Sequence, residues 1–88
     1  MEFVVLGKFR KLPTKDTPKI ADAKMAAMAK EGVKMKQIYW TLGRYDTVAI
    51  FEAPNERVAM KMGLSIGDII ATETLVAVPR DETILWLK

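Results

Sequence analysis

The 88-residue sequence contains no cysteine and no histidine. Their absence excludes disulfide bonds, thiolate chemistry, serine–histidine–aspartate and cysteine–histidine nucleophile pairs, and structural zinc sites of the usual type. Haem would also lack its common axial ligands. Carboxylates, tyrosine, lysine and arginine remain as side chains that could carry chemistry, and we expect neither a metal nor a cofactor.

Asparagine and glutamine occur once each, at Asn55 and Gln37. This depletion is typical of heat-adapted proteins, but six methionines weaken the argument, so a thermophilic source stays open. The first eight residues lack the basic start of a signal peptide, and the longest uncharged stretch, 37–43, is far shorter than a membrane span. We therefore expect a cytoplasmic protein that does not contact a membrane.

Half of the residues are hydrophobic and 28% are charged, which indicates one globular domain over residues 1–88. A chain of this length buries only about 60% of the surface that it exposes when unfolded, so a lone monomer would be marginally stable. We therefore expect a homodimer or a higher homo-oligomer.

Hydrophobic periodicity and turn residues divide the chain into six main elements. Strands are predicted at 2–9, 33–42, 47–53 and 69–78, and helices at 18–31 and from Pro54 or Asn55 up to Gly67. Thr17 is the expected cap of the first helix, and Asp81 a possible cap for the apolar tail. The apolar phase changes within 33–42, which suggests a bulge or a strand buried on different faces.

This order of elements predicts an α+β protein of the ferredoxin-like type, βαββαβ, with a four-stranded antiparallel sheet and helices on one face. The strands are apolar on both faces, whereas two helices cover only one. The uncovered face therefore predicts a second subunit, and we assign Ile38, Trp40 and Leu42 to that interface.

The connector Gly43-Arg44-Tyr45-Asp46, the segment Glu52-Ala53-Pro54-Asn55 and the last-strand segment Thr72-Glu73-Thr74-Leu75 together resemble the GYD domain family over nearly the whole chain. The resemblance implies a ferredoxin-like protomer that pairs as a dimeric α/β barrel, in a family whose molecular function is largely unassigned. The family's Gly, Tyr and Asp correspond to Gly43, Tyr45 and Asp46. Its usual acidic residue after Ala-Pro is Asn55 here, and its long C-terminal helix is shortened to an apolar tail, 84–87.

The candidate ligand-binding residues each have a structural and a functional interpretation. Gly43 and Asp46 suit a hairpin turn, because glycine permits positive φ and aspartate can bond its own backbone. Alternatively, Tyr45 and Asp46, with Arg44 beside them, line a cleft at the barrel mouth. Glu52 and Glu73 interrupt apolar strands, so they either face water at an edge or lie in the barrel interior with a raised pKa.

Residues 8–36 carry nine basic and three acidic side chains, a local charge of +6. A solvated face explains this charge, and so would binding of an anionic partner, although no aromatic motif of the RNA-binding type accompanies it. We expect no specific nucleic-acid binding.

Three functions remain open. The first is a homo-oligomeric module that binds a small molecule or regulates, without its own catalysis. The second is a cofactor-independent enzyme of the dimeric-barrel type that uses Tyr45, Asp46 or a buried glutamate for proton abstraction. The third is a weak binder of anionic partners through the basic segment.

Overall fold

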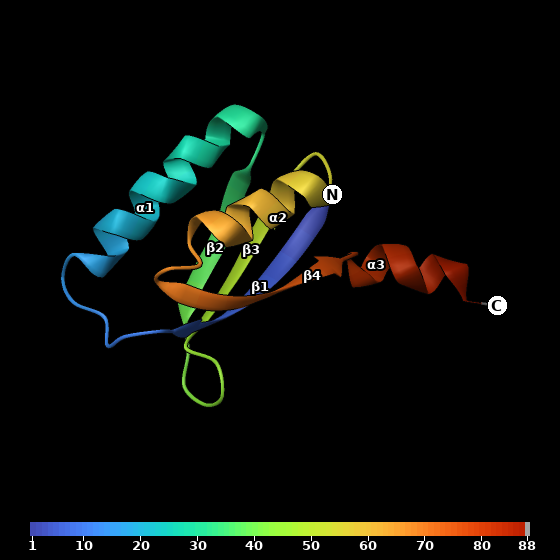
Figure 1. Ribbon diagram of the computed structural model, residues 1–88. Coiled ribbons are helices and arrows are strands. Elements are labelled where there is room, and N and C mark those ends of the chain that lie inside the picture. The colour runs from blue at the N-terminus through green and yellow to red at the C-terminus, as the bar shows by residue number, and fades with distance from the viewer. Residues whose placement is uncertain (88) are drawn as a thin grey trace.

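The computed structural model describes residues 1–87, which form one antiparallel sheet with two helices on one side (Figure 1). The strands are β1 (Glu2–Phe9), β2 (Lys34–Trp40), β3 (Thr47–Glu52) and β4 (Ile70–Ala77), in the spatial order β2-β3-β1-β4. Helix α1 (Thr17–Met28) joins β1 to β2, and α2 (Glu56–Ser65) joins β3 to β4. This is the predicted ferredoxin-like fold.

Two short segments of 3-10 helix and one short α-helix complete the described chain. Turn η1 (Ala29–Glu31) prolongs α1, and after β4 the chain continues as α3 (Arg80–Thr83) and η2 (Ile84–Trp86). No helix within residues 1–87 is long and apolar enough to cross a membrane.

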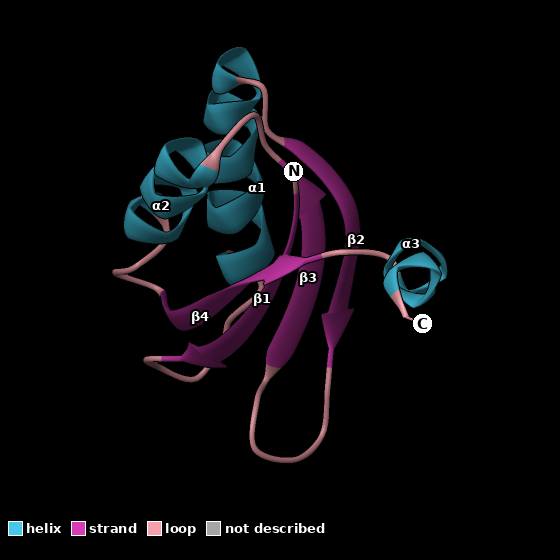
Figure 2. Ribbon diagram, turned by 90° about the vertical axis from the view of Figure 1, so that its right-hand side faces the viewer, coloured by secondary structure: helices cyan, strands magenta, loops and turns pink. Residues whose placement is uncertain are grey.

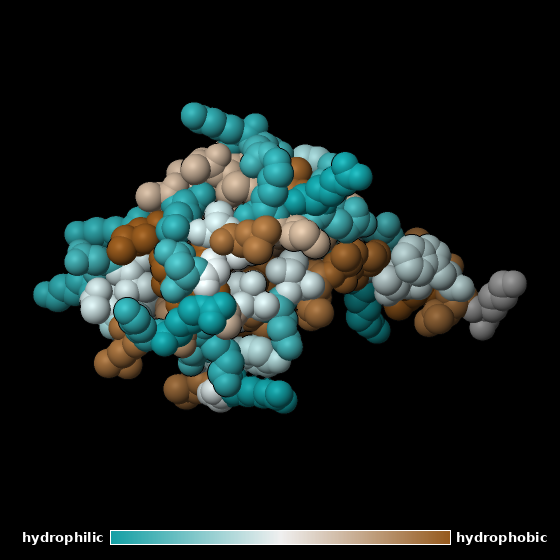
Figure 3. Space-filling model, viewed as in Figure 1, coloured by the Kyte–Doolittle hydropathy of each residue, from teal (hydrophilic) through white to brown (hydrophobic). Residues whose placement is uncertain are grey.

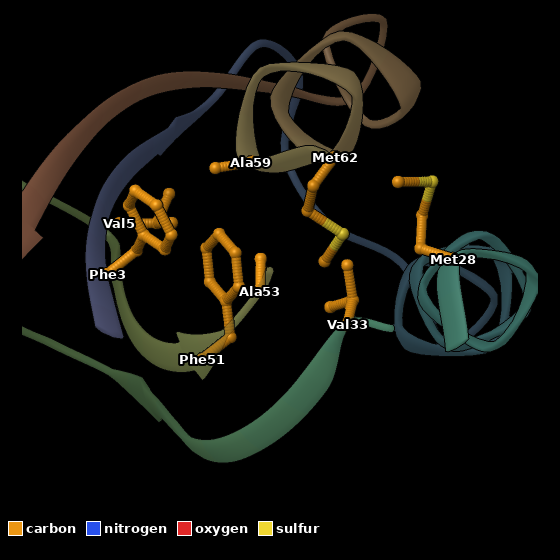
Figure 4. Close-up of a cluster of buried hydrophobic side chains, with 8 residues drawn as sticks. All are labelled: Phe3, Val5, Met28, Val33, Phe51, Ala53, Ala59 and Met62. Carbon is orange, nitrogen blue, oxygen red and sulfur yellow. The ribbon is translucent and has the colours of Figure 1, made fainter. Parts of the chain in front are cut away.

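The core lies between the sheet and the helix layer (Figure 4). Side chains alternate along β1, so Phe3 and Val5 point toward the helices. Phe3 is paired with Phe51 on β3, and the two rings stack with centroids 5.3 Å apart. Both side chains are almost completely buried, beneath Ala59 and Met62 of α2. This aromatic pair anchors the two central strands to the helix layer.

The helix ends follow the predicted signals in part. Asn55 caps α2, since its Oδ1 accepts a hydrogen bond from the backbone N–H of Val58 at 3.0 Å. The prediction that Thr17 caps the first helix was wrong: Thr17 is its first residue, and Asp16 occupies the cap position without a side-chain bond. The possible cap at Asp81 was two residues too late, because Pro79 occupies the cap position of α3 and Asp81 lies in its first turn.

The change of phase in the second strand is a bulge at Lys36. Met35 pairs with Phe51, but Gln37 already pairs with Ile50, so Lys36 is the extra residue. Beyond the bulge, Ile38 and Trp40 pair with Ala49 and Thr47. The bulge therefore keeps Met35, Ile38 and Trp40 on the helix-covered side of the sheet.

The opposite side of the sheet, which we call the open face, has no helix across it (Figure 2). Strand register places five aliphatic side chains together on it. They are Val4 and Leu6 of β1, Val48 and Ile50 of β3, and Leu75 of β4. Tyr39 of β2 joins them opposite Val48 and is 52% exposed. The sequence-based expectation of a sheet that is apolar on both faces is met at the centre of the open face, whereas Glu2, Glu52 and Glu73 occupy the same face toward its ends.

Gly7 provides a test of how tightly the central strands pack. A Cβ atom at Gly7 would lie 2.5 Å from Thr47 Oγ1 and 2.6 Å from Ile70 Cγ2, whereas one at Gly63 in α2 would meet Thr72 Oγ1 at an ordinary 3.5 Å. We expect Gly7→Ala to lower the free energy of unfolding by about 1 to 3 kcal/mol through overpacking. The control Gly63→Ala should instead raise it by about 0.5 to 1 kcal/mol. Urea unfolding measures both, and a fully stable Gly7→Ala protein would contradict the close packing.

Candidate functional site

The loop between β2 and β3 is tied to β1 through Asp46. Its carboxylate Oδ2 accepts a hydrogen bond from the backbone N–H of Phe9 at 2.9 Å, and its own N–H donates to the Gly7 carbonyl at 2.8 Å. The Asp46 carbonyl also accepts from the N–H of Thr41 at 2.8 Å. Asp46 thus extends the sheet pairing beyond the end of β3. The expected bond to its own backbone is replaced by one to a residue far away in sequence.

Tyr45 reaches across the sheet to β4. Its hydroxyl donates a hydrogen bond to Glu73 Oε2 at 2.6 Å. Because β1 lies between β3 and β4, the tyrosine side chain spans the end of β1 to make this contact. Glu73 pairs with Leu6, so the contact lies on the open face, and the Arg44 guanidinium stands 5.9 Å from the Tyr45 ring centroid.

The Tyr45–Glu73 contact affects the protonation of the phenol. The hydrogen bond to Glu73, aided by partial desolvation and the nearby negative charge, raises the pKa of Tyr45 above its ordinary value. Since that ordinary value is already about 10, the phenol stays protonated at neutral pH. Tyr45 is therefore a hydrogen-bond donor and not a base in this arrangement.

Glu52 belongs to a separate charged group at the other end of the open face. Lys36 Nζ lies 2.9 Å from Glu52 and 3.8 Å from Glu2. The hydrogen bond and charge attraction lower the pKa of Glu52 and raise the pKa of Lys36. The ion pair stabilises the folded state at pH values above the usual pKa of glutamate and below the usual pKa of lysine. This contribution is lost as the pH falls through the lowered pKa of Glu52 or rises through the raised pKa of Lys36.

The candidate residues therefore fall into two groups rather than one. Glu52 is opposite Glu2, and Glu73 is opposite Leu6, four positions further along β1. At about 3.3 Å per strand residue the two carboxylates are separated by roughly 13 Å along the strand direction. The structure brings together Arg44, Tyr45 and Glu73, but it does not join them to Glu52.

A cavity of about 160 Å³ lies on the opposite side of the sheet, between α1, α2 and the strands. Its walls are mostly apolar. They include Val5, Ile38, Trp40 and Ala49 from the strands, Ala21 and Met25 from α1, and Met62 and Ile66 from α2. The polar groups at its edges come from Thr17, Asp22, Thr47 and Thr72. No binding role was predicted for this cavity from the sequence.

The cavity exists because α1 stands away from the sheet. Four of the twelve residues of α1 are alanine, and only Met28 is buried. Its backbone approaches α2 more closely than it approaches the strands (Figure 1). Lys24 holds α1 to α2, since its Nζ lies 3.1 Å from the Ser65 carbonyl oxygen and 3.5 Å from Asp68.

The residues assigned to a dimer interface lie in different places. Ile38 and Trp40 line the cavity on the helix side, where Trp40 packs edge-on against Phe9 at 5.1 Å between ring centroids. They remain 43% and 57% exposed because the helix layer does not reach fully over β2. Leu42 lies in the β2–β3 loop and is fully exposed. In the sequence, the change of apolar phase in β2 was the signal that Ile38 and Trp40 could share a face with Met35 and so line this cavity.

The basic segment is partly occupied by intramolecular contacts. The Arg10 guanidinium donates to the Gly67 carbonyl, Lys24 binds α2 as described above, and Lys36 pairs with Glu52. These contacts give three of its nine basic residues a structural partner.

Comparison with known families gives one result. The family model described as the GYD domain matches residues 4–86, nearly the whole chain. A search of curated proteins finds no match.

The hydrogen bonds of the β2–β3 loop predict its contribution to stability. Asp46→Ala removes the acceptor of the Phe9 N–H and should lower the free energy of unfolding by about 0.5 to 2 kcal/mol. Tyr45→Phe should cost less, because it loses only the hydroxyl. Asp46→Asn keeps an oxygen acceptor and should recover most of the stability. Thermal denaturation followed by circular dichroism measures all three, and wild-type stability of Asp46→Ala would refute the structural role.

Proposed function

The chain belongs to the GYD domain family, and we propose that it is a homo-oligomeric module that binds a small apolar ligand without catalysis of its own. The cavity between α1 and the sheet carries this proposal, because it is concave, mostly apolar and bordered by a few polar groups. Such a combination is typical of small-molecule sites.

The size and lining of the cavity narrow the ligand class. An apolar cavity of about 150 Å³ holds one benzene molecule, so 160 Å³ suits a single-ring aromatic or a short aliphatic compound. Trp40, Phe9 and Met25 offer aromatic and thioether surfaces that favour contact with a ring. Thr47, Thr72 or Asp22 could orient one polar substituent.

The positions of the carboxylates favour binding over catalysis. Among residues 1–87, Asp22 is the acidic side chain that lines the cavity, and it is exposed. Tyr45, Asp46 and Glu73 lie away from the cavity lining, and their polar atoms already bond to one another or to backbone. A general base needs a pKa near the working pH and access to the ligand, which none of these groups combines.

The oligomer in this proposal forms through the open face. Its aliphatic patch of Val4, Leu6, Val48, Ile50 and Leu75 has the composition of a buried layer, and a second copy would present the same patch. A two-fold pair of sheets would bury both patches against each other, at the usual spacing of stacked sheets. In this proposal the interface lies on the side of the sheet opposite Ile38 and Trp40.

Ligand binding is tested by filling the cavity. Toluene, added to isotopically labelled protein, should shift the amide resonances of residues around the cavity in a saturable manner. Ala21→Leu places three more carbon atoms in the cavity and should raise the Kd of toluene about tenfold or more. Ala23→Leu makes the same change on the exposed side of α1 and should leave the Kd unchanged. Absence of saturable shifts in the wild-type protein would sink the proposal.

Dimerisation is tested on the open face. Leu6→Asp puts a charge in the middle of the aliphatic patch, and Leu75→Asp puts one at a position that is already 49% exposed. Both should convert a dimer into a monomer, as measured by multi-angle light scattering, while Leu75→Asp retains the wild-type circular dichroism spectrum. Leu12→Asp, in an exposed loop, is the control. A wild-type protein that is monomeric at about 100 μM, well above the micromolar Kd of an ordinary interface, would refute the interface.

A further inference from the structure

The segment Arg80–Leu87, which we call the C-terminal arm, leaves the body of the protein with its apolar side chains uncovered. Leu85 is 79% exposed, Trp86 65% and Leu87 77%. Figure 1 shows the arm running outward from the end of β4, and Figure 3 shows apolar surface along it and where it joins the body. Within residues 1–87, the arm makes no extensive contact with any other helix or strand.

An isolated arm of this kind would not hold its conformation in water. Its helical part, α3 and η2, covers only seven residues, and helices shorter than about 12 residues are marginal without tertiary packing. Besides its helical backbone bonds, the arm has a side-chain hydrogen bond from Thr83 Oγ1 to the Arg80 carbonyl at 2.9 Å. This bond lies within the arm and does not attach it to the sheet. A surface that covers its apolar side would supply the packing that the arm lacks.

The surface of the chain indicates how much is left to cover. The accessible surface is 6481 Å², whereas a compact monomer of this mass exposes about 5,200 Å². The radius of gyration is 13.8 Å, against about 12 Å for a compact chain of this length. The excess of about 1,300 Å² exceeds the roughly 800 Å² that each partner buries in a standard interface. A second copy of the chain would account for this area.

The arm and the open face lie on the same side of the sheet. In Figure 2 the helices lie on one side of the strands and α3 on the other. Leu75 and Ala77 of β4 belong to the open face, and the chain passes from them through Pro79 directly into α3. The arm therefore begins a few residues after Leu75 of the aliphatic patch, beside the charged group of Glu2, Lys36 and Glu52 at this end of the open face.

We propose that the C-terminal arm packs on a second copy of the chain and clamps the pair that forms through the open face. This inference rests on the open-face pairing proposed above. Two-fold symmetry would make the contact twice, once for each arm. A membrane surface is a poorer fit, because membrane-binding helices are rich in lysine and arginine, whereas the arm has Asp81 and Glu82 against Arg80.

Trp86 can report its own docking, because the chain has only one other tryptophan, Trp40. In a Trp40→Phe background, Trp86 fluorescence should move to shorter wavelength as the protein concentration rises, in step with dimer formation measured by sedimentation equilibrium. An emission maximum typical of water-exposed indole in the fully dimeric protein would overturn the proposal. So would a blue-shifted maximum that does not change with dilution into the monomer, since that indicates docking on the same chain.

Variants of the arm test its contribution to the pair. Leu85→Asp and Leu87→Asp should each raise the dimer Kd about tenfold or more, and Leu12→Asp, at a 90% exposed residue outside the arm, should change it less than twofold. An unchanged Kd for both arm variants, with Leu75→Asp still dissociating the dimer, would refute the arm and leave the open-face interface standing. Toluene binding is measured separately and reports on the cavity alone.

The membrane alternative is tested with the same fluorophore. Vesicles of phosphatidylcholine and phosphatidylserine are added to Trp40→Phe protein at fixed concentration. No change in Trp86 emission is expected. A shift that requires vesicles, with no shift on dimerisation, would overturn the proposal in favour of a lipid surface.

Discussion

A pleated strand presents side chains alternately to two faces, and in this protein both faces of the sheet have an apolar centre. Two connecting helices can cover only one of those faces, which is the constraint on which the rest of the structure depends. On the covered side, Phe3 and Phe51 form the centre of a conventional core. On the open side, Val4, Leu6 and Ile50 have no layer from their own chain to pack against (Figure 2). The proposed pairing of protomers follows from this imbalance.

The helix layer itself is uneven, and that unevenness creates the cavity. Helix α2 packs close to the sheet through Ala59 and Met62, whereas α1 contributes mainly alanines and one buried methionine, Met28. Small side chains fill little space, so a gap remains where α1 crosses the strands. The bulge at Lys36 keeps Ile38 and Trp40 turned toward that gap.

The Gly-Arg-Tyr-Asp connector between β2 and β3 links this hairpin to the other two strands of the sheet, β1 and β4. Gly43 has φ 101° and makes the turn possible, Asp46 continues the pairing to β1, and Tyr45 reaches β4. The residues that characterise the family in this loop thus have structural partners within the chain. Their positions do not require a reaction to explain them.

The sequence by itself determined the order of the elements, the ferredoxin-like topology and a change of phase in the second strand, which it left open between a bulge and a strand buried on different faces. Each of these depends on periodicity or on groups a few residues apart, which are visible along the chain. The Asp46 bond to Phe9 spans 37 residues, and the cavity depends on how far α1 stands from the strands. Which side of the sheet receives Ile38 and Trp40 was likewise decided by the register across the bulge. Only tertiary structure could settle these features, because distances between segments remote in sequence are set by how their side chains pack and not by local pattern.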